Sequence, residues 1–203
     1  MLGCVPAAVR RASHATYDSW RRFSNSRAAV ALIFVWAFGE ATVFPILADF
    51  LLAAMLVMGG ARRWVLAGAC IAGMAIGGIV TVLVARAAPG FALELLRDLP
   101  LITESHISRA GEQLADHGVA GFLVQPVSGI PFKAWAVMAG EQRLSPWLVI
   151  LVFIAARAAR MLAIAVLAQL LGRALGRRLR DWFAPLALAY VVLFCAGFAA
   201  VVL

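Results

Sequence analysis

Five long apolar segments, separated by short polar stretches, dominate the hydrophobic pattern of this chain. They cover residues 28–58, 64–85, 119–140, 146–171 and 183–203. A transmembrane helix needs about 20 apolar residues, and the second, fourth and fifth segments each match one such helix. The pattern therefore predicts an all-α integral membrane protein with three uninterrupted spans.

The first and third segments are interrupted near their middles by residues that break helices. These residues are Pro45 in the first segment and Pro126, Gly129 and Pro131 in the third. Broken backbone at membrane depth is tolerated only where protein or a cavity satisfies its polar groups. We therefore expect two re-entrant hairpins, each made of two half-helices. The alternative is that each segment is a single kinked span.

Composition and charge also favour a membrane location. Hydrophobic residues make up 64% of the chain and charged residues 14%, whereas soluble domains have about 45–50% and about 25%. Under the hairpin interpretation eleven basic residues fall on one side of the membrane and three on the other, with Arg86 at the border. This bias predicts a cytoplasmic N-terminus. The net charge of +8 is then explained by contact with anionic lipid, and we expect no nucleic-acid partner.

The predicted order of elements is an inverted repeat of two re-entrant helical hairpins, each followed by a transmembrane helix, plus a C-terminal transmembrane helix. Such repeats place a site near the membrane midplane. Three regions are expected: a basic interfacial arm over residues 1–27, the membrane domain over 28–172, and a basic loop with the last helix over 173–203. Trp20 and Phe23 would anchor the arm, although its composition also fits a mitochondrial transit peptide.

Small residues recur every four positions in the second segment. They form a ridge that allows another helix to approach closely, consisting of Ala69, Gly73, Gly77, Thr81 and Ala85. A shorter version, Ala155, Ala159 and Ala163, occurs in the fourth segment. We interpret both patterns as helix contacts.

Five ionisable residues lie inside the apolar segments, and they are the candidate substrate-binding residues: Glu40, Asp49, Lys133, Arg157 and Arg160. A cation at the bilayer centre costs roughly 2.5–3.5 kcal/mol, so such side chains face a polar interior. Three cations and two carboxylates leave a formal charge of +1, which favours an anion such as a lipid phosphate. The alternative is that the carboxylates only form structural salt bridges with the arginines.

Motifs for catalysis or metal binding are missing from the sequence. Cys4, Cys70 and Cys195 have no metal-binding spacing, and His106 and His117 lack further ligands. We therefore expect a protein that is not an enzyme and that uses no metal or other cofactor.

Residues 39–172 resemble the DedA family of membrane proteins, also called the SNARE-associated Golgi or VTT domain family. The resemblance rests on Glu40 with Pro45, on the glycine-rich stretch from Gly73 to Gly77, and on the order of three later motifs. These are Asp-His-Gly at 116–118, Gln-Pro-Val-Ser-Gly-Ile-Pro-Phe-Lys-Ala-Trp-Ala-Val-Met-Ala-Gly at 125–140, and Arg-Ala-Ala-Arg at 157–160.

The resemblance implies movement of lipids, including phosphate-bearing lipids, between leaflets in the manner of a flippase or scramblase. Many members have Asp at the position of Gly78 and Arg-Phe at the positions of Gln125 and Pro126, and a second family arginine falls near Pro131, where Lys133 is the nearest cation. The resemblance also implies that transport is coupled to protons, as in some branches of the family. These departures put such coupling in doubt for this chain and leave the identity of the lipid open.

We expect an integral protein of a bacterial cytoplasmic membrane whose partners are anionic or phosphate-bearing membrane lipids. The sequence leaves open whether the chain forms a homo-oligomer. Two other functions stay open: a non-transporting membrane scaffold with structural ion pairs, and a transporter of small anions or drugs.

Overall fold

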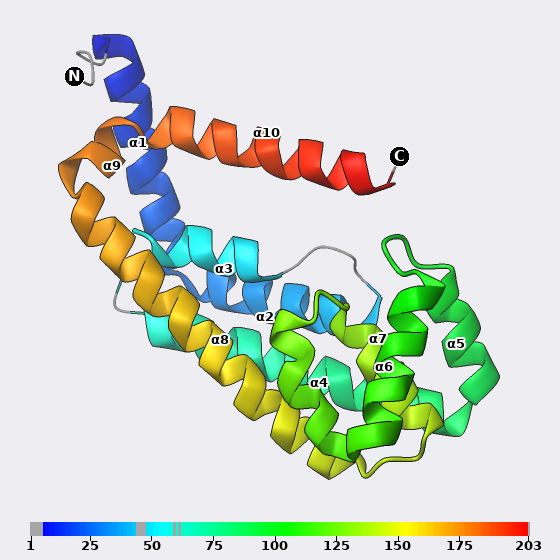
Figure 1. Ribbon diagram of the computed structural model, residues 1–203. Helices are drawn as coiled ribbons and strands as arrows, with labels where there is room; N and C mark the ends of the chain where they lie inside the picture. Colours follow the sequence, from blue (N-terminus) through cyan, green and yellow to red (C-terminus); the bar gives the residue numbers. More distant parts are fainter. Residues whose placement is uncertain (1–5, 44–47, 59, 61, 203) are drawn as a thin grey trace.

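The computed structural model describes residues 6–43, 48–58, 60 and 62–202, and every regular element in these ranges is a helix. The all-α prediction is thus confirmed (Figure 1). In chain order the elements are α1 (Ala7–Ser24), α2 (Arg27–Thr42), α3 (Ala48–Leu56), α4 (Arg63–Ala87), α5 (Pro89–Arg97), α6 (Glu104–His117), the 3-10 helix η1 (Gly118–Val127), α7 (Phe132–Glu141), α8 (Pro146–Leu175), α9 (Arg177–Asp181) and α10 (Phe183–Val202).

Two long helices form the frame of the molecule. α4 has 25 residues and α8 has 30, and within the described residues only these two are long and apolar enough to cross a membrane. They pack against each other in the centre of the bundle. α8 ends at Gly176, where φ is +47°, a left-handed conformation that glycine adopts readily after a helix.

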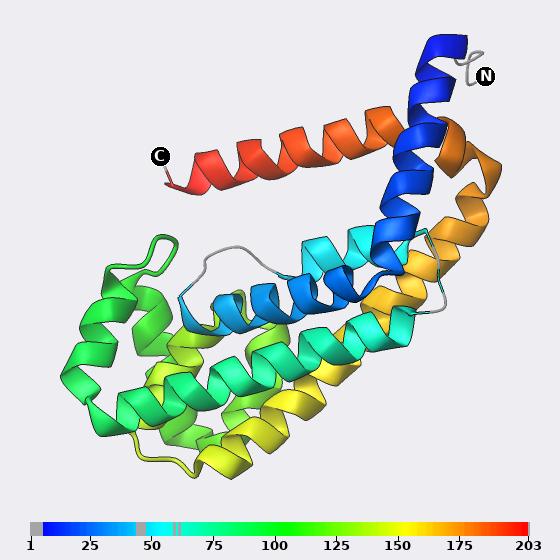
Figure 2. The ribbon, with the colours of Figure 1, turned by 180° about the vertical axis from the view of Figure 1, so that it is seen from behind.

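The first apolar segment folds as two helices instead of one. The hydroxyl of Ser26 accepts a hydrogen bond from the Ala29 N–H at 3.1 Å and so caps the start of α2. α3 then runs back beside α2 in the opposite direction (Figure 2). Pro45, the predicted break, lies outside the described residues.

The third apolar segment is also divided, but not at every predicted position. Pro126 lies inside η1; the fixed φ of proline suits a 3-10 helix and only one N–H donor is lost. The chain bends after it, at Gly129, where φ is +72°, and Pro131 directly precedes α7. Ser128 ties the bend together, since its hydroxyl donates to the Gln125 carbonyl at 2.9 Å and accepts from the Ile130 N–H at 3.2 Å.

The helix pairs α2/α3 and η1/α7 reach opposite ends of the two long helices, α4 and α8. Val57, just after α3, contacts Gly172 near the end of α8. Gly140, at the end of α7, lies against Ala85 near the end of α4. The described pieces of the first and third segments therefore occupy the bundle from opposite sides.

The small-residue ridge of α4 faces other helices, as the pattern suggested. A Cβ on Gly77 would lie 2.7 Å from the Phe38 carbonyl oxygen and 2.9 Å from the Ala41 Cβ. Thr81 donates to the Ala41 carbonyl at 2.9 Å, so α2 sits directly on the ridge. By contrast, the shorter alanine pattern of α8 faces away from the bundle, because Ala155, Ala159 and Ala163 are all exposed.

The N-terminal helix α1 packs against the bundle through both of its predicted anchor residues. Its anchor Trp20 donates its indole N–H to the Ala54 carbonyl at 3.1 Å, and Phe23 packs against the core. The last carbonyls of a helix lack partners within that helix, and Trp20 supplies one for α3. α1 is thus held by protein contacts.

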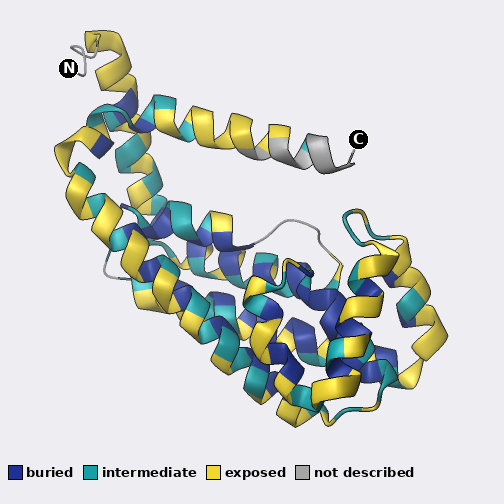
Figure 3. Cartoon of the chain, in the orientation of Figure 1, coloured by how far each residue is buried: buried dark blue, intermediate teal, exposed yellow. Residues whose placement is uncertain are grey.

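Two short helices form in the predicted connector and basic loop, and the last apolar segment forms α10. α5 precedes the predicted connector helix, and the short α9 replaces part of the basic loop. α10 packs against α1 at its start, and further along the Tyr190 hydroxyl donates to the Phe50 carbonyl of α3 at 2.8 Å. Much of the described surface of α10 is nevertheless exposed, with Leu188 66% exposed (Figure 3). The apolar stretch described in it, Phe183–Leu193, is shorter than α4 or α8.

Candidate functional site

The candidate site is a cluster of charged side chains buried between α2, α3, α7 and α8. Glu40, Asp49, Lys133 and Arg157 are only 5%, 6%, 4% and 1% exposed. The Arg160 side chain, one turn further along α8, is 31% exposed. All five predicted site residues therefore lie in or beside this cluster, which we call the charged cluster.

Arg157 occupies its centre, with a different neighbour for each guanidinium nitrogen. Nη2 donates to Glu40 Oε1 at 2.9 Å, and Nη1 lies 3.8 Å from Asp49 Oδ2. Nε points at Met74 Sδ at 3.2 Å, and the Phe153 ring centroid lies 5.9 Å from the guanidinium carbon. This single side chain links α8 to α2, α3 and α4.

Glu40 serves two partners at once. One carboxylate oxygen accepts from Arg157, and the other, Oε2, accepts from the Ala48 backbone N–H at 2.5 Å. Ala48 is the first residue of α3, so the carboxylate satisfies one of the N–H groups left free at a helix N-terminus and faces the positive end of the helix dipole. Glu40 thereby fixes where the second short helix begins.

Asp49 is held less completely than Glu40. Its Oδ2 forms an ion pair with Arg160 Nη2, yet neither carboxylate oxygen has hydrogen-bond geometry to any described residue. Arg160 also donates through Nη1 to the Pro126 carbonyl at 3.3 Å. The partly exposed arginine thus connects α3 to η1 of the other helix pair.

Lys133 comes from the first turn of α7 and lies close enough to Glu40 for their charges to interact. With it, the charged cluster holds three cations and two carboxylates. The formal excess of one positive charge that the sequence suggested is therefore present in a single place.

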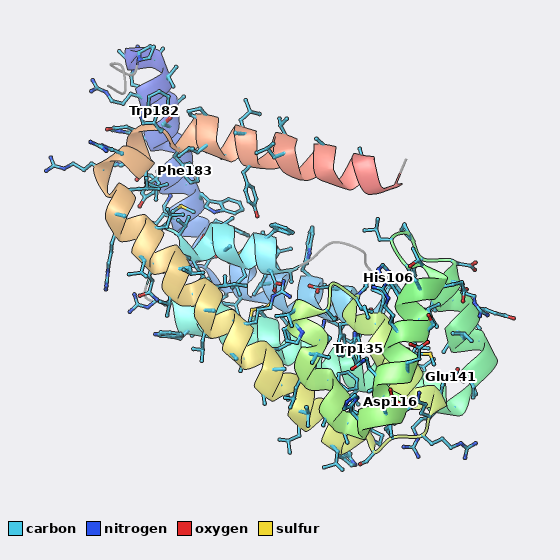
Figure 4. The ribbon with its side chains drawn as sticks, viewed as in Figure 1. His106, Asp116, Trp135, Glu141, Trp182 and Phe183 are labelled. Carbon is cyan, nitrogen blue, oxygen red and sulfur yellow. The ribbon has the colours of Figure 1, made fainter. Side chains whose placement is uncertain are left out.

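Sequence reasoning missed Met74, which contacts Arg157, and two other interior polar groups, the Gln125 amide and the Trp135 indole. Gln125 is 5% exposed; its Nε2 donates weakly to the Ile130 carbonyl at 3.5 Å, and its Oε1 has no described partner. The Trp135 indole nitrogen, in the interior of α7, is likewise without one (Figure 4). Met74 had no signal in the sequence, whereas Gln125 had one, an amide in an apolar stretch beside a proline.

The histidine candidates lie on the outer helix α6, whereas Cys70 of α4 lies near the charged cluster, where the charges of Glu40, Asp49 and Arg157 act on its thiol. His106 and Asp116 are on the outer helix α6 (Figure 4), and the described residues contain no group of three or more side chains that could hold a metal ion. Cys70 is buried and Cys195 is exposed, while Cys4 lies outside the described residues.

Comparison of the chain with protein-family models, with curated proteins and with solved structures gives no match.

Proposed function

We propose that this chain is an integral membrane protein that moves lipids with anionic, phosphate-bearing head groups between the two leaflets. The observation that carries the proposal is the contrast between the two arginines of α8. Arg157 is fully enclosed, whereas the Arg160 side chain is 31% exposed and its partner Asp49 lacks hydrogen bonds in the described part of the chain. An arriving phosphate could replace this incomplete pairing and gain paired guanidinium donors.

The surface around the charged cluster supports contact with lipid. α8 carries large apolar side chains on its outer face, where Leu151, Leu162 and Leu167 are 65%, 52% and 64% exposed. Large exposed apolar side chains along a helix are typical of surfaces that meet lipid or another protein. In a bilayer these side chains would face acyl chains.

The proposed path uses the two pairs of short helices as re-entrant hairpins of an inverted repeat. The head group would pass near Arg160, between α3 and η1, while its tails stay in lipid. Half-helix ends and arginines would replace its water, as in carriers with broken helices. The resemblance to the DedA family supports the same function, and its departures at Gly78 and Gln125 leave the lipid and any proton coupling open.

Leaflet exchange in liposomes tests this function directly. Purified protein would be reconstituted with fluorescent phosphatidylglycerol or phosphatidylcholine, and the fraction of label reachable by an external quencher would be followed over time. We expect faster exchange of the anionic lipid than in protein-free liposomes. Exchange at the protein-free rate for several anionic lipids would contradict the proposal.

The alternative with a specific observation behind it is a non-transporting membrane scaffold. Every nitrogen of the Arg157 guanidinium has a protein neighbour, as a purely structural ion pair would require. A scaffold would show no exchange, yet it would still lose stability when Arg157 is removed. Measuring both properties on the same sample separates the two functions.

A further inference from the structure

A small pocket lies at the arginine-rich end of the bundle, away from the charged cluster. It has a volume of about 200 Å³ and lies where α1, the start of α4, the end of α8 and α9 meet. The polar side chains that line it are Tyr17, Arg63, Gln169 and Arg173. We propose that this pocket binds a phosphate group, a function that does not depend on lipid transport.

The chain fold explains why the pocket is open. Gly172 packs directly on the Val57 carbonyl, which brings α8 close to the connector before α4. One turn later Gly176 ends α8, and the chain turns into α9, so that Leu179 closes another wall. On the α1 side, Tyr17 is fixed by an edge-to-face contact with Phe183, with ring centroids 5.4 Å apart.

The charges of the lining favour an anion. Within the part of the chain that the structure describes, no carboxylate lines the pocket. The acidic groups of α1 and α9 have other partners: Asp18 Oδ2 lies 2.6 Å from Arg180 Nη2, and Asp181 Oδ1 lies 2.7 Å from His14 Nε2. Among the described residues, none forms a salt bridge with Arg63 or Arg173. Two guanidinium groups are therefore available beside a phenol hydroxyl and an amide.

The size of the pocket indicates which anion fits. Pockets for whole drug-sized ligands measure about 300–1,000 Å³, so this one suits a head group and not a complete lipid or nucleotide. Arginine recognises phosphate through paired donors. Free phosphate and the phosphate of a lipid head group share this chemistry.

The test measures binding by the full-length purified protein in detergent. Inorganic phosphate is titrated by equilibrium dialysis, and a short-chain phosphatidic acid is titrated by native mass spectrometry. Arg63→Gln and Arg173→Gln are each expected to weaken binding about tenfold, the usual effect of losing one charged hydrogen bond. Arg178→Gln is the matched control, because it removes the same charge from the same end of the molecule without touching the pocket.

The outcomes distinguish the source of the phosphate. Arginine-dependent binding of both probes supports a site for free and lipid-borne phosphate, and arginine-dependent binding of phosphatidic acid alone supports a head-group site. Equal losses in Arg173→Gln and Arg178→Gln, or binding unchanged in both pocket variants, would overturn the proposal. Neither Arg63 nor Arg173 belongs to the charged cluster, so loss of phosphate binding in these variants and loss of lipid exchange are separate results.

Discussion

The guanidinium group of Arg157, on α8, contacts residues of α2, α3 and α4 and so links four helices. Its contacts with Glu40, Asp49 and Met74 leave little room for a substrate. Arg160, by contrast, pairs with Asp49 and one backbone carbonyl among the described residues and is partly exposed. The two arginines look similar in the sequence but differ in the structure. Arg157 forms the structural centre of the charged cluster, and Arg160 lies at its accessible edge.

Removing the Arg157 side chain should make the protein unfold more easily. Arg157→Ala would leave Glu40 charged, buried and without its ion pair, and we expect a loss of about 3–5 kcal/mol in the free energy of unfolding. Arg157→Lys keeps the charge but loses the planar fork, so we expect an intermediate loss. Thermal unfolding in detergent measures both.

The control for this series is Arg109→Ala, because Arg109 is exposed on α6. Such surface changes shift stability by about 0.5 kcal/mol or less. If Arg157→Ala unfolded at the same temperature as Arg109→Ala, the structural role of Arg157 would be excluded.

At the scale of elements, the contact of α2 with α4 depends on glycine. Gly77→Ala would place a Cβ 2.7 Å from the Phe38 carbonyl oxygen, and overpacking of this kind costs about 1–3 kcal/mol. Gly68 lies on the same helix with nothing within 4 Å of an added Cβ. Gly68→Ala should therefore be neutral or stabilising by up to about 1 kcal/mol.

Chemical denaturation of both glycine variants checks this prediction. The expected order of stability is Gly68→Ala, then wild type, then Gly77→Ala. A Gly77→Ala protein as stable as the Gly68→Ala protein would show that α2 does not pack on the ridge in solution.

The sequence was most informative where a physical cost marks a residue. Charged side chains in apolar segments and prolines in helices are costly, and these signals located the charged cluster and the division of the third segment. The exposed alanines of α8 were misjudged, because small residues suit lipid, protein or solvent equally. α9 has only five residues and depends on tertiary contacts that no local pattern encodes.

At the scale of the whole molecule, the basic residues gather at one end. Arg63 and Arg173 line the same pocket beside Tyr17 of α1, although they are more than one hundred positions apart in the chain. At the other end of the molecule, Arg86 donates a hydrogen bond to the Leu144 carbonyl at 3.0 Å. How these two ends are oriented in a membrane stays a prediction from the sequence.

The uneven distribution of basic residues along the chain predicts how the protein is oriented in the membrane. We expect residues at 62 and 177 to face the cytoplasm and those at 104 and 143 to face outside, since positive residues remain on the cytoplasmic side. Single cysteines at these positions, on a background without Cys4, Cys70 and Cys195, would be labelled with an impermeant reagent in cells. Labelling of positions 62 and 177 from opposite sides would rule out this topology.

The central claim is that Arg160, at the accessible edge of the charged cluster, contacts the head group during exchange. The most direct measurement is the rate of anionic-lipid exchange by Arg160→Gln in liposomes, with thermal stability measured in parallel. Because the change also strands Asp49, the double variant Arg160→Gln with Asp49→Asn provides a folded comparison, and Arg109→Gln provides the charge-matched control. We predict that both cluster variants stay folded and exchange lipid about tenfold or more slowly than wild type, as loss of a charged hydrogen bond implies. Wild-type exchange rates in a folded double variant would contradict the claim.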